Sequence, residues 1–464
     1  MIESILPIAD GKPKSKRILI ADFKRDFGII LSQNKQVELR GRVRNLRRFK
    51  SISFGVLQDQ SDQTQLAFSD ETTPGTTELA KQLNTGDVIS VTGSAFVSKK
   101  EERSLVVEQL EVVTRFNGPF PDRYKGVQDT GKRRGNFPLQ LITDRDSFVF
   151  FDRISKVNMS LRDNLNRLGF KEFETPVLRR QFRSGQAKPF VTHQNSLGTD
   201  MFMRPTSELE LVQLIAAGYE RVYELGKAFR NEGQDRFHNP EYTALEAYAA
   251  YSDYNGMMDL AEYLVREAVT RAFGTSRFLL NGECINVDTK WGQMTVDEGF
   301  KLFGDFSLNE INSLDSLKKM AAKNNILLSG LPLTQEVGKL IEKIIVPKLL
   351  QPTFLRDFPV GLAPLGKTTG YDENKVERAW ACMNGIGFAD ISTNLVNSTE
   401  LQKKLAGQDS EMGIQERDHS TDPLVIALNY GVPPTAGLGI GLNRLLMIVG
   451  NQKSLRETIL FPDI

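Results

Sequence analysis

Cysteine is almost absent from this sequence. Only Cys284 and Cys382 occur among 464 residues, far apart, and neither belongs to the paired spacing of a zinc site or a disulfide framework. Residues 1–19 lack the apolar core of a signal peptide, and nowhere do about 18 apolar residues run together, as a membrane-spanning helix requires. These absences exclude a disulfide-stabilised module and predict a soluble, cytoplasmic chain with no membrane partner.

The sequence also lacks an excess of charge of either sign. Its 59 basic residues oppose 58 acidic ones, so the formal net charge is +1. Any surface that binds nucleic acid must therefore be a local patch rather than a property of the whole chain. Internal repeats and low-complexity tracts are missing as well. The length allows two or three domains, each with its own core.

Short β-rich segments separated by turn residues fill positions 36–115. They are QVELRGRVRNLRRF, SISFGVLQD, QTQLAFSD, DVISVTGSAFV and SLVVEQLEVVT. Five such strands are typical of a small barrel, and the OB-fold is the leading candidate. The basic and aromatic residues Arg47, Arg48, Lys50 and Phe54 suit phosphates and splayed bases, although a solvated strand face would explain them equally well.

The composition changes twice after this segment. Residues 116–143 are rich in Gly, Pro and charge and predict a linker between a domain at 1–115 and a second at 144–464. In the second, apolar residues at helical spacing predict long helices over 146–170 and 254–273 and a helical insertion at about 300–350, with separated strands between them. We expect an α+β domain built on a largely antiparallel sheet.

The stretch FRNEGQDRFHNPEYTALEAY, residues 229–248, joins two predicted strands through a polar loop at 231–239. Alternation along the second strand places Tyr242, Glu246 and Tyr248 on one face. Such a polar set on a mostly buried strand is costly unless it binds something. The alternative is that Glu246 pairs with a neighbouring Lys or Arg in a structural network.

A second stretch, GVPPTAGLGIGLNRLLMI, lies at 431–448. Its glycines at 437, 439 and 441 permit a ligand to approach the backbone closely, and the predicted helix from Leu442 carries Arg444 in its first turn. Alone, a glycine-rich strand followed by a helix is a weakly specific signal.

Together with GFKEFETPVL at 169–178, these stretches resemble motifs 1, 2 and 3 of the class II aminoacyl-tRNA synthetases, and in detail the lysyl-tRNA synthetase family. The resemblance covers most of residues 36–464. It implies an antiparallel class II catalytic domain preceded by an N-terminal OB-fold barrel that binds the anticodon, and a homodimer formed through motif 1. The implied reaction activates an amino acid with ATP and transfers it to tRNA.

The resemblance also implies roles for single residues. Arg230 matches the motif 2 arginine that bridges phosphate and carboxylate, and Arg444 the motif 3 arginine; these are the implied catalytic residues. The residues matched to ATP contacts are Arg230, Glu232, His238, Tyr242 and Arg444, with adenine stacked between Tyr242 and Arg444. Glu208 matches the carboxylate near the substrate's α-amino group, while Glu246 and Tyr248 match residues that line the pocket toward its side chain. Arg47, Phe54 and Gln65 match anticodon contacts, and Gln109 stands in place of the family's glutamate.

The segment VERAWACMNGIGFADISTNLVN, residues 376–397, departs from the family pattern. That pattern is Arg-Phe-Glu, followed by Glu-Ile-x-Asn-Gly-Phe-Ser-Glu-Leu. Laid on without gaps, the two glutamates that hold ATP-bound magnesium fall on Trp380 and Gly387. The family implies Mg²⁺, but these ligands are not retained, so no metal ligand is assigned unless Asp390 or Glu377 takes over.

The amino-acid pocket changes in the same segment. The glutamate that receives the ε-ammonium of lysine falls on Asn394, and the pocket's asparagine and phenylalanine fall on Asp390 and Ser392. The usual aspartate of motif 3 is Asn443. A buried ammonium without a carboxylate costs several kcal/mol. Asp390 and Asn394 are therefore the candidate pocket residues, and they leave the amino acid undecided.

Three hypotheses follow. The first is a tRNA ligase for lysine, or for an altered amino acid, with its metal ligands elsewhere. The second is a paralogous enzyme that adenylates an amino acid for an acceptor other than tRNA, which the OB-like domain argues against. The third is a tRNA-binding or regulatory protein with a decayed site. The retained Arg230 and Arg444 favour the ligase, because a decayed site has no need of two arginines beside an aromatic ring.

Overall fold

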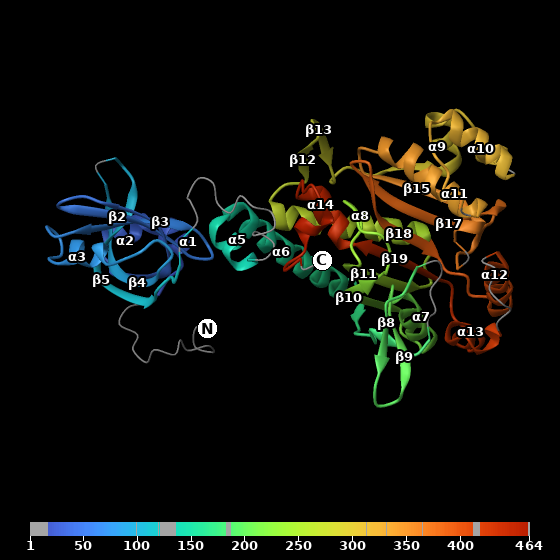
Figure 1. Cartoon of the computed structure of the whole chain (residues 1–464), viewed down its shortest axis with the longest axis horizontal. Coiled ribbons are helices and arrows are strands. Elements are labelled where there is room, and N and C mark those ends of the chain that lie inside the picture. The colour runs from blue at the N-terminus through green and yellow to red at the C-terminus, as the bar shows by residue number, and fades with distance from the viewer. Residues whose placement is uncertain are drawn as a thin grey trace. The chain divides into compact units, whose positions relative to one another are not determined.

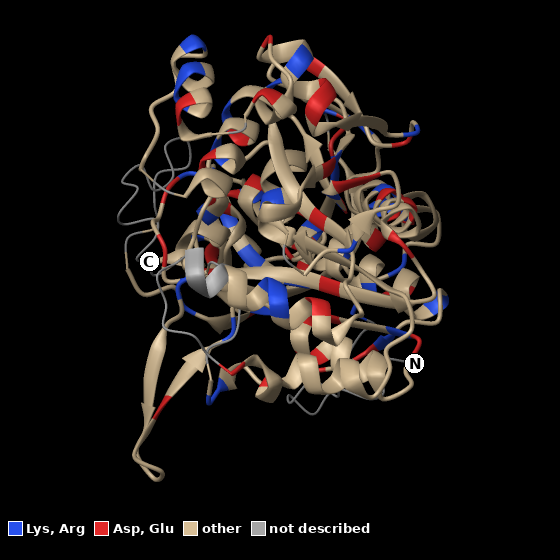
Figure 2. Ribbon diagram, turned by 90° about the vertical axis from the view of Figure 1, so that its right-hand side faces the viewer, with Lys and Arg blue, Asp and Glu red and all other residues tan. Residues whose placement is uncertain are grey.

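The structure is a computed structural model that describes residues 17–98, 100–118, 120, 136–181, 187–311, 313–330, 332–363, 365–411 and 418–462. The chain divides into two compact units, Met1–Gln128 and Asp129–Ile464. The middle of the predicted linker, 121–135, lies outside the described residues, and its last part forms the helix α5 (Phe137–Thr143). Lysine and arginine are interspersed with aspartate and glutamate along the ribbon (Figure 2), as the balanced charge requires.

The first unit contains a closed barrel with strand order β1-β2-β3-β5-β4 (Figure 1). The strands and helices of this unit are β1 (Val37–Arg48), β2 (Ile52–Gln58), β3 (Gln63–Ser69), β4 (Val88–Val97), β5 (Arg103–Thr114), α1 (Ile20–Arg25), α2 (Phe27–Ser32) and α3 (Thr76–Lys81). Its core includes Leu39, Leu66 and Val91, which alternate with outward residues along their strands. The predicted five-stranded OB-fold barrel is confirmed.

The second unit is built on a large sheet that runs β14-β15-β17-β18-β19-β11-β10-β6, with β16 paired to β17. The strands are β6 (Lys171–Glu172), β10 (Arg221–Phe229), β11 (Glu241–Ala250), β14 (Gly292–Thr295), β15 (Thr353–Pro359), β16 (Thr368–Thr369), β17 (Asp372–Met383), β18 (Ile386–Thr393) and β19 (Thr435–Gly441). Only the β14/β15 and β10/β6 pairings are parallel. The predicted largely antiparallel α+β domain is confirmed.

Helices α6 (Arg145–Arg167), α8 (Tyr254–Phe273) and α14 (Leu442–Val449) contribute to the core against one face of this sheet. Asp144 and Asp253 cap the first two helices by accepting backbone N–H groups, and Gly274 ends α8 in a left-handed conformation with φ of 72°. Because Leu245, Ala247 and Ala249 of β11 pack into this core, the alternate residues of β11 lie on the opposite face.

Smaller elements surround the other face and the sheet ends. They are α7 (Glu208–Ala216), α12 (Ser398–Glu411), α13 (Pro423–Asn429), the three-stranded sheet of β7 (Leu178–Arg179), β8 (Val191–Gln194) and β9 (Thr199–Met203), the hairpin of β12 (Arg277–Leu280) and β13 (Glu283–Asn286), and the 3-10 turns η5 (Val360–Leu362), η6 (His419–Thr421) and η7 (Leu455–Thr458). Helices α7, α12 and α13 form their own core with Val222 and Tyr248. No helix in the described part of the chain is long and apolar enough to cross a membrane.

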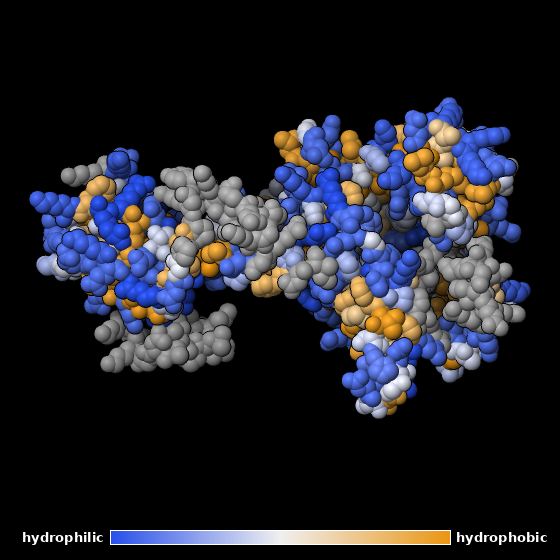
Figure 3. All heavy atoms as spheres, in the orientation of Figure 1, coloured by the Kyte–Doolittle hydropathy of each residue, from blue (hydrophilic) through white to orange (hydrophobic). Residues whose placement is uncertain are grey.

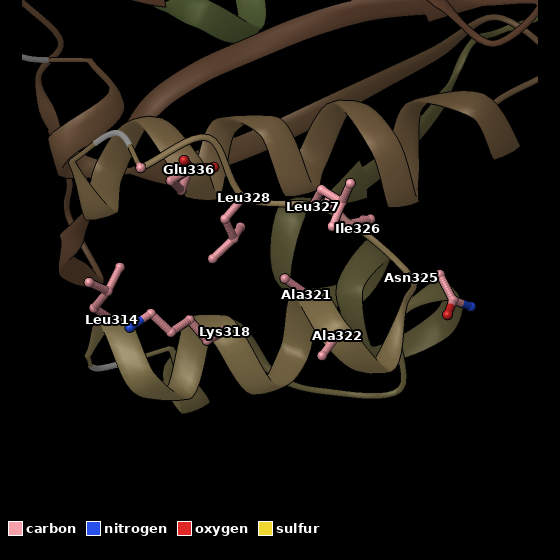
Figure 4. Close-up of a pocket in the computed structure, with 10 residues that line it drawn as sticks. Leu314, Lys318, Ala321, Ala322, Asn325, Ile326, Leu327, Leu328 and Glu336 are labelled. Carbon is pink, nitrogen blue, oxygen red and sulfur yellow. The ribbon is translucent and has the colours of Figure 1, made fainter.

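The insertion between β14 and β15 is helical. Its elements are α9 (Val296–Phe303), η2 (Leu308–Glu310), α10 (Leu314–Lys323), α11 (Leu333–Leu340), the π-helix η3 (Ile341–Ile345) and η4 (Val346–Lys348). Apolar side chains gather on the surface of this region (Figure 3), and a cavity of about 660 Å³ opens between α10 and α11 (Figure 4). Leu314, Ile326 and Leu328 are among the residues that line this cavity, and its lining includes no predicted site residue.

Candidate active site

The predicted site residues lie in rows across the face of the sheet opposite α6 and α8. Successive partners across β17, β18, β19 and β11 are Trp380, Asp390, Gly439 and Glu246 in one row, and Arg378, Ser392, Gly437 and Tyr248 in the next. Because partners on antiparallel strands share a face, segments far apart in sequence meet here. The predicted alternation of Tyr242, Glu246 and Tyr248 on one face agrees with this register.

Glycines of β19 lie between the site residues of β11 and those of β18. A Cβ at Gly437 would lie 2.2 Å from the Tyr248 ring, and one at Gly439 would lie 3.0 Å from the Glu246 carboxylate. Side chains at these positions would displace the residues that line the pocket. The glycines of this strand therefore leave the room that the Tyr248 ring and the Glu246 carboxylate occupy.

Arg230 and Tyr242 stand at one end of the site. The exposed guanidinium of Arg230 lies 5.5 Å from the centroid of the Tyr242 ring, and the Tyr242 hydroxyl donates to the carbonyl of Pro205 over 3.2 Å. Burial raises the pKa of Tyr242, so its phenol stays neutral. Glu232, in the same loop, accepts a hydrogen bond from the Lys188 backbone N–H over 3.4 Å.

His238 connects the loop to the motif 3 helix. Its Nδ1 lies 2.9 Å from Asp235, and its Nε2 lies 2.8 Å from Nη2 of Arg444. Arg444 also donates to the carbonyls of Phe237 and Gly387, each over 3.3 Å. Burial lowers the pKa of Arg444, Glu342 opposes this shift, and the nearby charge of Arg230 lowers the pKa further. Arg230 and Arg444 thus place two cations around Tyr242, and His238 holds the Arg444 guanidinium by accepting a hydrogen bond from it.

Glu208 and Glu246 form an acidic pocket next to these two cations. Thr206 Oγ1 donates to Glu246 over 3.1 Å, and the Tyr248 hydroxyl donates to its other oxygen over 3.4 Å. Burial, followed by the charge of Glu208, raises the pKa of Glu246 to about 8. Burial and the charge of Asp390 raise the pKa of Glu208 to about 7. Among the described residues Glu246 has no ion-pair partner, which removes support for the structural alternative.

Asp390 is held by an arginine that the sequence analysis did not single out. Arg378 Nε and Nη2 donate to the two oxygens of Asp390 over 2.8 and 2.5 Å, and Nη1 donates to the Leu362 carbonyl over 2.6 Å. Half of the Asp390 side chain remains exposed toward the site. Arg378 stands two residues before Trp380 on the same strand, so alternation along 376–382 was the signal that could have revealed it.

Asn394 lies at the edge of the same pocket. Its side chain is buried, and Nδ2 donates to Glu208 over 3.3 Å. Its Oδ1 has no hydrogen-bond partner among the described residues. A buried amide oxygen without a donor favours a ligand that can supply one. Ser392, in the neighbouring row, lies beside Gly437.

The residues at the family's metal positions do not fit Mg²⁺. Trp380 packs its ring 4.7 Å from Phe358, and Gly387 offers only a backbone carbonyl that already accepts from Arg444. Glu377 lies on the other face of β17 and pairs with Lys367 at 3.6 Å, so it does not replace them. No cluster of three metal-ligating side chains occurs in the part of the chain that the structure describes.

Asn443 has a structural part in this site. Its Oδ1 accepts the backbone N–H of Thr243 over 2.7 Å, and its Nδ2 donates to Thr458 Oγ1 over 2.9 Å. The buried amide therefore fixes β11 to α14 and η7, with one acceptor and one donor that a carboxylate could not both supply.

On the barrel, Arg47 and Phe54 are direct partners on β1 and β2, and Gln65 lies on the same outer face of β3. Phe54 is half-buried and makes an edge contact with the exposed Phe49 ring, with centroids 6.4 Å apart. Gln65 donates to Ser104 over 3.0 Å. Arg48, by contrast, is engaged by the carbonyls of Ala80 and Leu83.

The antiparallel sheet, the arginine-bearing loop and the glycine-rich β19–α14 unit define a class II tRNA synthetase catalytic domain. The family described as tRNA synthetases class II (D, K and N) matches residues 137–464, and the OB-fold nucleic acid binding domain matches residues 37–113. The chain belongs to this class II family and is thus an enzyme of the aminoacyl-tRNA ligase class.

Curated relatives match nearly the whole chain. The lysine–tRNA ligase of Chloroflexus aurantiacus is 32% identical over 96% of this chain and 92% of its own length. The lysine–tRNA ligase of Staphylococcus aureus strain MW2 is 33% identical over 92% of this chain and 88% of its own, and that of Moorella thermoacetica is 32% identical over 93% and 89%. These comparisons give no support to the non-tRNA or regulatory alternatives.

Proposed function

We propose that this chain activates lysine with ATP and transfers it to tRNA. The observation that carries the proposal is the set of three carboxyl groups in the pocket, Glu208, Glu246 and Asp390, of which Arg378 pairs with Asp390. Glu208 and Glu246 form no ion pair among the described residues, and lysine brings two ammonium groups that can pair with their ionised forms. Neutral amino acids bring one. The lysine–tRNA ligase relatives support the same substrate.

The first step joins the carboxylate of the amino acid to the α-phosphorus of ATP and breaks the bond to pyrophosphate. In the proposed arrangement Arg230 bridges the attacking carboxylate and the α-phosphate, where its planar fork can bind two oxygens at once. Two observations support this role: the guanidinium lies 5.5 Å from the Tyr242 centroid, and its charge acts on Glu246. Charge that develops on the phosphate then meets a fixed cation.

Adenine is proposed to lie against Tyr242, with Arg444 on its other side. His238 holds the Arg444 guanidinium at 2.8 Å, and Glu232 reaches the same space from the loop. In the second step the tRNA 3′-hydroxyl attacks the activated carbonyl, and AMP leaves. The barrel face with Arg47, Phe54 and Gln65 is proposed to bind the anticodon, where a basic and an aromatic side chain serve phosphate and base.

We also propose a homodimer that works in the cytoplasm. Exposed apolar side chains occur on α6 (Met159) and at the end of the motif 1 stretch (Leu178), and the β8–β9 hairpin adds Val191 and Leu197. Sedimentation equilibrium should give twice the chain mass, and Met159→Glu should weaken that assembly. Leu327→Glu, at an exposed leucine of the insertion, is the matched control and should leave it unchanged.

The proposed function is tested by charging purified tRNA with radiolabelled lysine. Charging of lysine tRNA, and of no other tRNA in a total pool, is the expected result. Formation of an adenylate without charging of any tRNA would contradict the transfer step and the assignment of tRNA as the acceptor.

A further inference from the structure

We propose that this chain binds the phosphates of ATP with its own guanidinium groups, without metal ions held by protein carboxylates. The inference rests on the nucleotide site of the proposed function and deepens it. It concerns how negative charge on the nucleotide is compensated, which the identity of the amino acid does not decide.

Aromatic and cationic groups occupy the part of the site where the resemblance implies metal ligands. The Trp380 ring packs on Phe358, and the Arg378 guanidinium lies 5.5 Å from the Trp380 centroid. Mg²⁺ takes oxygen ligands in a strict octahedron, and neither an indole nor a guanidinium supplies one. A Cβ built on Gly387 would meet only Cys382 Sγ, at 3.8 Å, so no neighbouring oxygen stands in for the missing side chain.

The carboxylates nearby are already engaged or lie at the margin. Both oxygens of Asp390 are held by Arg378. Asp235 accepts the backbone N–H groups of Phe237 and His238 as well as the imidazole. Glu342, on the exposed side of the π-helix, acts on Arg444 electrostatically and is the remaining acid that could approach a bound cation, together with Glu232.

The cations of the site, in contrast, lack carboxylate partners. Among the described residues, neither Arg230 nor Arg444 forms an ion pair, although each is close enough to affect the other. Like charges held together in a partly buried site are stabilised by an anion. The ATP phosphates provide that anion, and their charge is greatest when no metal is bound to them.

Isothermal titration of ATP into the wild-type chain, once with excess Mg²⁺ and once with EDTA, tests the proposal. We expect the Kd in EDTA to be within about threefold of the Kd in Mg²⁺, or lower, because guanidinium contacts with phosphate need no metal. Arg230→Met should lose at least about tenfold in both buffers, since a charge-assisted contact with phosphate is removed. Glu342→Gln is the matched control and should leave the ratio of the two Kd values unchanged.

A loss of more than about tenfold on replacing Mg²⁺ with EDTA would overturn the proposal, because it would show that the ion is part of the bound complex. Loss of that Mg²⁺ dependence in Glu342→Gln would then identify Glu342 as a ligand of the ion. The proposed function is separable from this result: lysine can be activated by a site that needs Mg²⁺ to hold ATP, and ATP can bind without Mg²⁺ to a site that activates no amino acid.

Discussion

The two sides of the catalytic sheet differ in how many of the residues implied by the family resemblance they retain. On β10, β11 and β19 the arginine, the aromatic residues, the glutamate and the glycines stand in register around one space. On β17, on β18 and directly after it, Trp380, Gly387 and Asn394 stand at positions where the resemblance implies acids. The first side holds the proposed reacting groups, and the second surrounds the amino acid and the phosphates.

The changed side still carries an acidic charge. Asp390 lies in the same row as Glu246, across Gly439. Arg378 fixes it with two hydrogen bonds, and Trp380 and Phe358 support Arg378 from their ring faces. At position 380 the resemblance implies a metal ligand. Here Trp380 instead supports Arg378, and through it the carboxylate of Asp390.

The largest effect is expected on the retained side. Arg230→Ala should lower the rate of adenylate formation by about 100-fold to 1000-fold, as for other fixed charges aimed at a developing anion, with an unchanged melting temperature. Pyrophosphate exchange measures the rate. Arg236→Ala, in the same loop, is the control and should stay within about threefold. Full activity in Arg230→Ala would contradict the assignment of Arg230 to the reacting groups.

The acidic pocket should make lysine binding depend on pH. Because the pKa values of Glu208 and Glu246 are raised to about 7 and about 8, both carboxyl groups carry protons in the free site at pH 6 and lose them on binding an ammonium. The KM for lysine should therefore fall by at least about tenfold from pH 6 to pH 8 and then level off. Glu246→Gln should flatten the upper part of that curve. A KM that is constant with pH would show that these carboxylates do not meet the substrate.

Asp390→Asn should remove the negative charge that β18 contributes to the pocket. It leaves Arg378 without a carboxylate partner and so makes the net charge of the pocket less negative by one, and the KM for lysine should therefore rise about tenfold to 100-fold with little change in kcat. Ser392→Ala, two residues along the same strand, is the control. Equal losses in kcat and kcat/KM would instead indicate a role in the transition state.

The smallest effect is expected away from the sheet. Phe54→Ala should weaken tRNA binding by about 1 to 3 kcal/mol if a base stacks on this ring, with pyrophosphate exchange unchanged. Phe96→Ala, at another partly exposed phenylalanine of the barrel, is the control. Fluorescence titration with lysine tRNA gives both affinities. Unchanged tRNA affinity would assign Phe54 to packing against Phe49.

Much of this arrangement could be predicted from the sequence because local patterns determine it. The period of two along 241–250 and the glycines of 437–441 predict strands and a shared face, and the barrel strands follow from turn residues at regular spacing. The pairing of Arg378 with Asp390 could not be predicted, because it depends on the register between β17 and β18. The same is true of Asn443, whose role depends on Thr243 and Thr458, distant in sequence.

The most direct test of the account is ATP–pyrophosphate exchange by the purified protein with each of the twenty amino acids in turn. The account predicts exchange with lysine and little with any neutral amino acid, because only a second ammonium satisfies the charge of the pocket. Exchange with a different amino acid would contradict the assignment of Glu208, Glu246 and Asp390. Silence with all twenty, in protein that still binds ATP, would contradict activation itself.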